Sequence, residues 1–400
     1  MESSAGHRTG SENGRPRVAI HCQYVYGIGH YVRSLQLARG LSKGFDVFLL
    51  NGGEVVPNYN LPPCVSCLQL PEIRKEETSP CLLPVDRSWT LDDCFRARAN
   101  VLEDFVNENP PDILITEHYP FGDLFETEVM RLIADVKKRK RDARIVSSVR
   151  DVVESETGSC RDRHVCSVLN QIYDMVLVHS DERMVPFSTS FPLVHRIEIP
   201  VHHTGYIVQP VESRAVRDDP PLLLVSIGGG TVGGELLDAV LDAHERVAKE
   251  WRHQMVLFAG AFQKDIRHLR RRSEEVGNGQ VTIRAFDRDG YRDMLASASG
   301  VICLGGYNSI LEAVSAGLPT LVYERTFHGS NREQAVRTAL FERSGLIRRL
   351  SPKDLSIDRI VPRILALLEC PRSPHNSVRM DGAENSRLLL NRLMYSNDYS

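Results

Sequence analysis

No uninterrupted apolar run in the 400-residue chain approaches the roughly 20 residues that a membrane-spanning helix requires. The chain also lacks an excess of either charge: a formal net charge of -3 gives no general reason to expect binding to nucleic acid. The N-terminal stretch MESSAGHRTGSENGRP lacks the apolar centre of a secretory signal. These absences predict a soluble cytoplasmic protein that has no nucleic-acid partner. Peripheral contact with the inner face of a membrane stays open.

Cysteine is infrequent, and its nine residues are an odd number. Cys64 and Cys67 form a CxxC pair, but the later Cys81 and Cys94 do not continue the spacing of a compact zinc knuckle. An odd count without a secretory signal also disfavours a disulfide framework. Free thiols in a reducing compartment, with no metal site, are therefore expected.

Two series of short apolar segments alternate with helical patterns along the chain. Such alternation predicts parallel sheets, with functional residues in the loops after the carboxyl ends of the strands. The expected fold is therefore α/β, with two Rossmann-like, doubly wound domains that face each other across a cleft. The predicted strands are RVAIHC, FDVFLL, DILIT and ARIVSSV in the first series, then PLLLVSIG, HQMVLFAG, QVTIRAF, GVICLG and PTLVYE in the second. The predicted divisions are a disordered tail (1–16), a first domain (17–205), a linker (206–220), a second domain (221–370) and a C-terminal tail with a helix (371–400).

A Gly27-Ile28-Gly29-His30 turn follows the first predicted strand and opens a helix. A dinucleotide-binding turn would carry a third glycine where Val32 stands, and an acidic residue where the next strand ends in Asn51. NAD is therefore disfavoured, and no cofactor is expected. At the helix start His30 would face the cleft, where an imidazole can act as a general base. The alternative is a capping or core histidine.

Two glycine-rich turns in the second half join a strand to a helix, in SIGGGTVGG and LGGYNSILE. Backbone N–H groups at a helix start can hold an anion such as a diphosphate. Glu312, one helical turn after Ser309, can accept hydrogen bonds from a ribose diol. The alternatives are turns without a ligand, and an ion pair of Glu312 with a cation such as Arg325. The donor-binding residues predicted here are Gly229, Gly230, Thr231, Gly305, Gly306, Asn308, Ser309 and Glu312.

The second of these turns resembles the nucleotide-sugar-binding motif of GT-B glycosyltransferases, especially the N-acetylglucosaminyltransferase family of peptidoglycan lipid synthesis. The matching residues are Gly305, Gly306, Ser309, Glu312, Ala313, Gly317 and Pro319. Tyr307-Asn308 departs from the small residues usual in that family. The resemblance extends over about residues 17–350. Over most of the chain, including EHYPFG and SSVRD, the sequence is most similar to a group of bacterial predicted glycosyltransferases.

This resemblance implies roles for further residues. Glu333 and Gln334, in HGSNREQ, would hold the hydroxyls of the donor sugar, and Phe286 would lie near the uracil. The GxGHxxR turn resembles the N-terminal motif of the same fold, so His30 is expected to be the base and Arg33 to support it. The acceptor-side candidates at turns and strand ends are Gly29, Arg33, Glu117 and Arg150, where an ion pair or a helix cap is the alternative for Glu117 and Arg150.

The predicted activity is transfer of a hexosyl group from a nucleoside diphosphate sugar, with UDP as the expected nucleotide, to a hydroxyl acceptor that is either lipid-linked or a small metabolite. Helix starts can stabilise the departing diphosphate, so the reaction is expected to need no metal. The alternatives are a nucleotide-sugar hydrolase with water as the acceptor, an epimerase of the same fold, and a non-catalytic nucleotide-sugar-binding protein.

Overall fold

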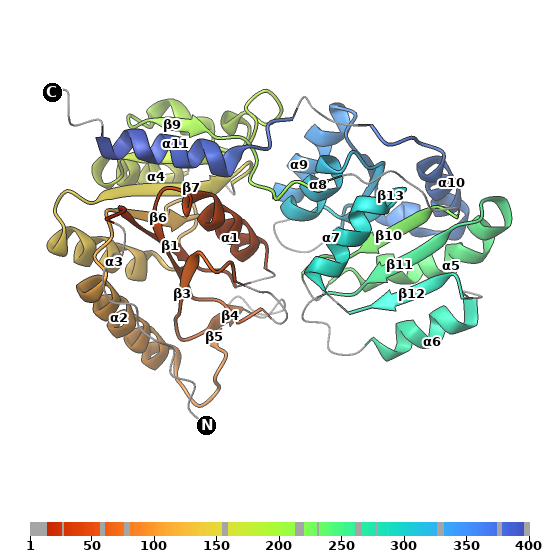
Figure 1. Cartoon of the computed structure of the whole chain (residues 1–400), viewed down its shortest axis with the longest axis horizontal. Helices are drawn as coiled ribbons and strands as arrows, with labels where there is room; N and C mark the ends of the chain where they lie inside the picture. The colour runs from red at the N-terminus through yellow and green to blue at the C-terminus, as the bar shows by residue number, and fades with distance from the viewer. Residues whose placement is uncertain are drawn as a thin grey trace.

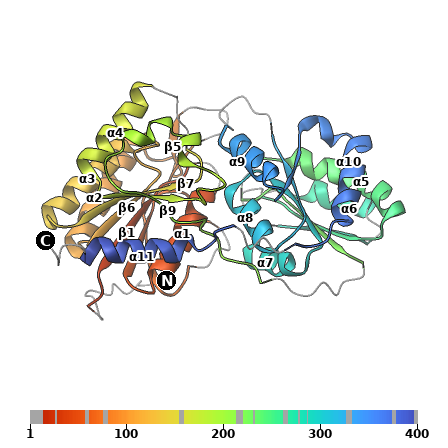
Figure 2. The same ribbon diagram turned by 90° about the horizontal axis from the view of Figure 1, so that it is seen from above.

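The computed structural model has two parallel β-sheets, each covered by helices on both faces (Figures 1 and 2). The strand orders are β3-β2-β1-β6-β7-β8-β9 in the first sheet and β12-β11-β10-β13-β14-β15 in the second. All neighbouring strands within these two sheets run parallel, so the predicted pair of doubly wound sheets is confirmed. The structure describes residues 14–25, 28–56, 61–75, 81–153, 159–212, 220–229, 232–260, 266–276, 279–285, 287–325, 332–373 and 378–395.

The first domain contains nine strands and four helices among its described residues, two of the strands forming a separate hairpin. The strands are β1 (Arg17–Cys22), β2 (Asp46–Asn51), β3 (Val65–Gln69), β4 (Ile73–Lys75), β5 (Leu82–Pro84), β6 (Ile113–Glu117), β7 (Arg144–Arg150), β8 (Met175–His179) and β9 (Val201–His203). The helices are α1 (Gly29–Leu41), α2 (Leu91–Glu108), α3 (Glu126–Arg139) and α4 (Cys160–Ile172).

The second sheet is formed by six strands and flanked by six helices in the described part of the chain. The strands are β10 (Leu222–Ser226), β11 (Gln254–Phe258), β12 (Val281–Arg284), β13 (Gly300–Leu304), β14 (Thr320–Tyr323) and β15 (Arg348–Leu350). The helices are α5 (Gly234–Glu250), α6 (Arg267–Val276), α7 (Arg288–Ser297), α8 (Tyr307–Ser315), α9 (Arg332–Arg343) and α10 (Ile357–Leu368).

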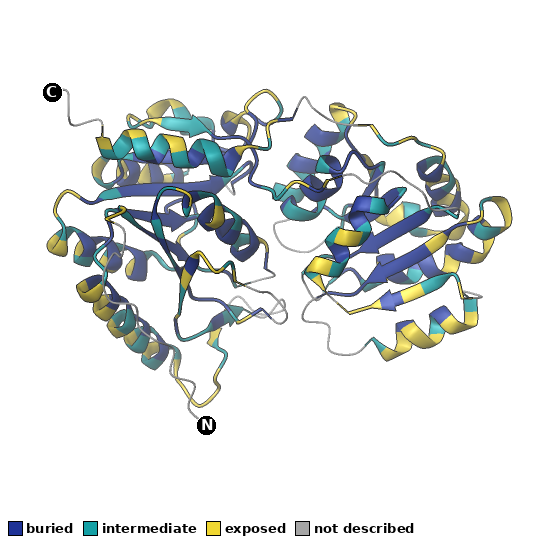
Figure 3. Ribbon diagram, viewed as in Figure 1, coloured by how far each residue is buried: buried dark blue, intermediate teal, exposed yellow. Residues whose placement is uncertain are grey.

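Alternating side chains divide the core of the first domain into two layers. Val18, Ile20 and Cys22 of β1 face α1, whereas Ala19 faces the layer that includes α2, α3 and α4. The second sheet is covered in the same manner, by α7, α8 and α9 on one face and by α5, α6 and α10 on the other. Both sheets are consequently buried between helices, as Figure 3 shows. Parallel strands buried on both faces read as the continuous apolar runs found in the sequence.

The last described helix, α11 (Gly382–Tyr395), returns to the first domain and packs on α1 (Figure 1). A Cβ atom on Gly40 would lie 2.6 Å from the Ala383 Cβ, so the absence of a side chain permits this close packing. Beside this helix the chain crosses between the domains twice, and the crossings are joined by the Tyr206 N–H donating to the Arg379 carbonyl at 2.8 Å. The packing of α11 therefore ties the C-terminal segment to the first domain.

Candidate active site

The glycine turns of the two domains meet across the domain boundary. The Asn308 side-chain amide donates to the Gly29 carbonyl at 3.1 Å, which joins the start of α8 to the start of α1. A Cβ on Gly229 would lie 2.2 Å from the Ile28 Cγ1, so only glycine fits there without movement of Ile28. The structure thus brings the predicted base-bearing turn against both predicted donor-binding turns.

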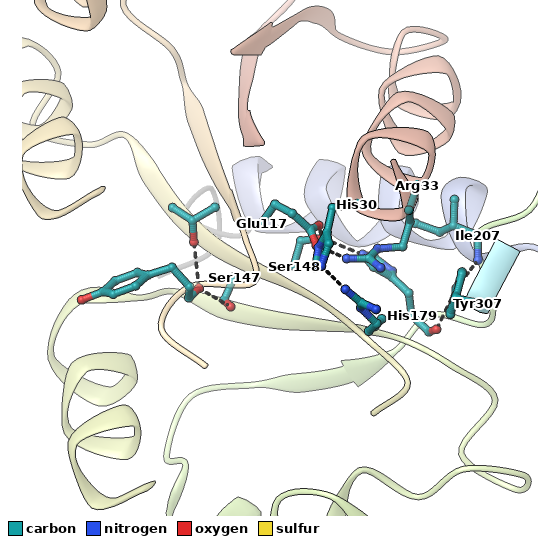
Figure 4. Close-up of polar contacts among 12 residues, drawn as sticks. His30, Arg33, Glu117, Ser147, Ser148, His179, Ile207 and Tyr307 are labelled. Carbon is teal, nitrogen blue, oxygen red and sulfur yellow. Dashed lines mark hydrogen bonds and ion pairs between the residues drawn. The ribbon is translucent and has the colours of Figure 1, made fainter. Parts of the chain in front are cut away.

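His30 lies in the first turn of α1, with its Nδ1 atom 2.8 Å from Glu117 Oε1 (Figure 4). An ionised carboxylate can only accept, so this bond assigns the ring proton to Nδ1 and leaves a lone pair on Nε2. The Arg150 guanidinium donates to that Nε2 atom. Burial and the nearby Arg150 hold the pKa of His30 well below its ordinary value. The imidazole is therefore neutral near pH 7, which is the form that a base requires.

Glu117 is the last residue of β6, and buried polar groups hold its carboxylate in place. It accepts hydrogen bonds from the Arg33 guanidinium and, at 3.2 Å, from the Ser148 hydroxyl, which pairs in register on β7. The Ser148 hydroxyl lies 2.9 Å from Nε2 of His179, the last residue of β8 (Figure 4). Parallel strands end at the same edge of a sheet, which explains how Glu117, Ser148 and His179 come together.

Tyr307 replaces a small residue of the family motif and is buried between the domains. Its hydroxyl donates to the His179 carbonyl at 3.0 Å and accepts from the Ile207 N–H at 3.0 Å. The guanidinium carbons of Arg33 and Arg337 each lie 5.5 Å from the centre of its ring. Burial, with Arg150 nearby, lowers the pKa of Arg33 to about 10, so the guanidinium stays charged near neutral pH. Tyr307 therefore connects the predicted donor-binding turn at the start of α8 to the first domain.

A further polar contact across the boundary joins Arg150, at the end of β7, to Glu333, in the first turn of α9. Arg150 Nη1 lies 2.7 and 2.8 Å from the two carboxylate oxygens of Glu333. Glu333 also binds Arg337, whose guanidinium forms two bonds to Asp151 at 2.7 and 2.6 Å. Burial alone would raise the pKa of Glu333, but Arg150 and Arg337 reverse that effect and lower it to about 2. The carboxylate that the sequence assigned to sugar hydroxyls is thus ion-paired here.

The two predicted donor-binding turns, before α5 and before α8, present mainly backbone groups. Gly306 is the N-cap of α8 and Gly233 that of α5, and neither helix start has a side-chain cap. Gly228 has a φ of 72°, a conformation that favours glycine, and a Cβ there would lie 3.5 Å from the Ser309 hydroxyl. Gln334 borders the same site, because its Oε1 atom would be 3.3 Å from a Cβ on Gly305. Three predicted donor residues, Gly230, Thr231 and Phe286, lie outside the described residues.

Glu312 is buried in α8, with 3% of its surface exposed. Its Oε1 atom accepts from Arg288, and from Arg292 at 3.3 Å. An ion pair of Glu312 with a cation, the alternative that the sequence leaves open, is therefore present, but its partners are Arg288 and Arg292, whereas Arg325 lies 2.8 Å from Glu235. Two arginines therefore hold the carboxylate beside the start of α8.

His118, which follows Glu117 at the end of β6 and is predicted with it to line the cleft, is a neighbour of His30. Among the described residues it is the one non-glycine with a positive φ, 69°, and its ring centre lies 5.4 Å from that of His30. Gly122 leaves room for the ring, since a Cβ there would be 2.3 Å from His118 Cδ2. Burial and the charge of Arg150 lower the pKa of His118 to about 3, so it is neutral.

Within the described ranges, no group of three or more histidine, cysteine or acidic residues is arranged to hold a metal ion. All nine cysteines are free. No helix among the described residues is both long and apolar enough to cross a membrane.

Comparison with known proteins places these residues in a recognisable fold. Residues 224–393, fewer than half of the chain, match the family model of the glycosyltransferase family 28 C-terminal domain. The comparison with curated proteins finds no match. Similar solved structures include the calicheamicin glycosyltransferase CalG4, with 17% identity, a TM-score of 0.59 and coverage of 96% of this chain and 100% of that one.

Two further structures have the same architecture. MurG of Acinetobacter baumannii has 12% identity and a TM-score of 0.56, over 94% of this chain and 100% of that one. A putative UDP-N-acetylglucosamine 2-epimerase of Listeria monocytogenes has 12% identity and a TM-score of 0.60, over 96% and 98%. These structures confirm the GT-B fold, and with the domain match they confirm the resemblance to the MurG-like family. The domain match also supports glycosyl transfer as the general class of activity.

Proposed function

We propose that the protein transfers a hexosyl group from a UDP-linked sugar to a hydroxyl group of an acceptor, in the cytoplasm and with at most peripheral contact with a membrane. The observation that carries the proposal is the contact of the His30-bearing turn with the start of α8 through Asn308 and Gly29. A neutral imidazole that is hydrogen-bonded to the Glu117 carboxylate thereby lies next to the turn that we propose binds the nucleotide sugar.

In this proposal His30 Nε2 takes the proton of the acceptor hydroxyl as the oxygen bonds to the sugar. Glu117, on the opposite ring nitrogen, stabilises the imidazolium that results, as a carboxylate does behind a histidine base. Arg33 and Ser148 keep Glu117 oriented and charged. Proton transfer by a positioned base typically contributes roughly 100- to 10,000-fold to the rate.

The donor would be held chiefly by the second domain. The uncapped N-termini of α5 and α8 offer backbone N–H groups and positive dipole ends to the diphosphate. As the bond between the sugar and the diphosphate breaks, these groups stabilise the developing charge, so we propose that no metal is required. Glu312 would bind the ribose diol, and Glu333 and Gln334 the sugar hydroxyls.

The test is incubation with a panel of nucleotide sugars, with and without a cellular lipid and metabolite extract, in the presence and absence of EDTA. Nucleotide release that depends on the extract and survives EDTA is the expected result. Release without extract would instead mean that water is the acceptor. A changed sugar on intact donor would mean epimerisation, and binding without turnover would mean a sensor. Each of these three outcomes would overturn the proposal of transfer.

A further inference from the structure

The Nε2 atom of His30, which must accept a proton in the proposed reaction, already accepts a hydrogen bond. Arg150 donates to Nε2, and the same guanidinium forms two bonds to Glu333. These three side chains are each partly exposed to solvent, by 17% for His30, 16% for Arg150 and 15% for Glu333. The groups behind them, Glu117 and Arg337, are each 1% exposed. A substrate can therefore reach the first three side chains, and Arg150 must move before His30 can act.

The Arg150–Glu333 pair is asymmetric. If Glu333 releases Arg150, its carboxylate keeps Arg337, which is in turn held by Asp151. Glu333 is the single carboxylate bonded to Arg150 among the described residues, and the Arg150 Nε atom is buried there without a partner. A guanidinium left in a largely buried site without a counter-ion is strongly disfavoured. Arg150 thus needs a new anion when Glu333 turns to the sugar.

We infer that Arg150 receives an anionic oxygen group of the substrate, a phosphate or a carboxylate, and that this contact draws Arg150 away from His30. The inference rests on the proposed function for the roles of His30 and Glu333. The planar fork of a guanidinium suits two-point binding of either anion. The anion has two sources: a charged group on the acceptor, or the donor diphosphate. In both cases the Nε2 lone pair of His30 becomes free only when the substrate is bound. Without the substrate, His30 cannot activate a water molecule, and hydrolysis of the donor is restrained.

A binding experiment tests this without knowledge of the acceptor. The full chain, carrying ¹⁵N-histidine, is titrated at pH 7.5 with UDP, with glycerol 3-phosphate and with uncharged glycerol, and the Nε2 resonance of His30 is followed by NMR. The resonance is expected to move with at least one anion and not with glycerol. In Arg150→Met it should start from a different position and no longer respond to that anion. Movement with UDP identifies the diphosphate as the source; movement with glycerol 3-phosphate identifies an acceptor anion.

An Nε2 resonance that neither anion moves in the wild-type protein would overturn the inference, as would an equal response in Arg150→Met. The wild-type titration decides the matter even if the variant folds poorly. Arg150→Lys, which keeps the charge but loses the fork, should respond more weakly than the wild type.

A second test of the inference measures nucleotide release during turnover. Extract is separated on an anion exchanger, and each fraction is tested for stimulated nucleotide release. If Arg150 binds an anionic group of the acceptor, the stimulating fraction should be retained by the anion exchanger. Arg150→Met should then raise the apparent KM for that fraction by roughly 10- to 150-fold, the change expected from the loss of a hydrogen bond to a charged group. A raised KM for the donor would identify the diphosphate instead. A stimulating fraction that is not retained, with both KM values unchanged in the variant, would contradict the inference.

The matched control is Arg246→Met, which removes an exposed arginine that pairs with Asp358 at 2.7 Å on the second domain. It should change neither KM. If no fraction stimulates release, the proposed transfer fails, and the NMR titration still judges Arg150 by itself.

Discussion

The two sides of the domain boundary present different chemical groups to the site, mainly side chains on one side and mainly backbone on the other. On the first-domain side, the site consists of charged and polar side chains that bind one another, such as His30, Glu117 and Arg150. On the second-domain side it consists mainly of glycines and uncapped helix starts, as at Gly229 and Gly306. Proton transfer needs side chains in fixed positions, whereas an anion can be held by backbone N–H groups. Side-chain truncation should therefore affect turnover on the first side, and an added Cβ should affect binding on the second.

The largest expected effect is on the first-domain side. His30→Ala should reduce kcat by roughly 100- to 10,000-fold, because the proposed base acts only as the acceptor attacks. Binding of UDP, measured by calorimetry, should stay unchanged, since the variant leaves the second domain intact. A loss of kcat below about 10-fold, in a variant whose melting curve matches the wild type, would remove His30 from the role of base.

Glu312 is one of the side chains that depart from this pattern on the second-domain side. If it binds the ribose diol, Glu312→Ala should raise the UDP dissociation constant by about 10- to 150-fold. The wild type should bind 2′,3′-dideoxy-UDP poorly, and the variant should barely distinguish it from UDP. If Glu312 only anchors Arg288 and Arg292, the variant will keep its preference for the diol. Glu342→Ala, which removes a partly exposed partner of Arg349, is the control and should bind UDP normally.

The contact between Gly229 and Ile28 tests whether the second side depends on the absence of a side chain. Gly229→Ala places a Cβ 2.2 Å from Ile28 Cγ1 and should cost about 1 to 3 kcal/mol of unfolding free energy, the usual range for overpacking. UDP binding should weaken with it. Adding Ile28→Ala should restore part of both quantities, which a double-mutant cycle in denaturant measures. Additive losses of unfolding free energy in the two variants would show that the contact between residues 229 and 28 does not restrict the side chain at position 229.

Acid stability tests the buried polar groups of the first-domain side through His118. Its folded pKa of about 3 lies below the ordinary value, so between these two values the unfolded chain binds a proton that the folded chain excludes. Stability is therefore full above about pH 6.5 and falls as the pH drops towards 3, by at most about 1.4 kcal/mol per pH unit for one histidine. His118→Asn should flatten that slope, because asparagine tolerates a positive φ and does not titrate. His30 and His179, and His244 of the second domain, have pKa values that burial also lowers, so they should maintain a residual slope. An identical slope in the variant would show that His118 protonates freely in the folded state.

The sequence predicted the strands and turns much better than the contacts between them. Apolar runs identified β1, β10 and β13, and the glycine turns after these strands meet at the site. MVLVH, which forms the buried strand β8, was overlooked although its pattern is the same. The pairing of Arg150 with Glu333, 183 residues apart, could not be predicted, because it depends on how two separately folded sheets dock. The roles of the individual site residues stay predictions.

The smallest expected effect concerns Gln334, a neutral side chain on the backbone-rich side. In the proposed role it binds sugar hydroxyls and not the nucleotide, so Gln334→Ala should weaken the intact UDP-sugar and leave UDP unchanged. A neutral hydrogen bond contributes about 0.5 to 1.5 kcal/mol, which corresponds to a roughly 2- to 13-fold rise in the donor dissociation constant. Equal weakening of UDP would show that Gln334 does not contact the sugar. Because Gln334 also packs beside Gly305, a lower melting temperature with unchanged sugar preference would assign it to the support of that turn instead.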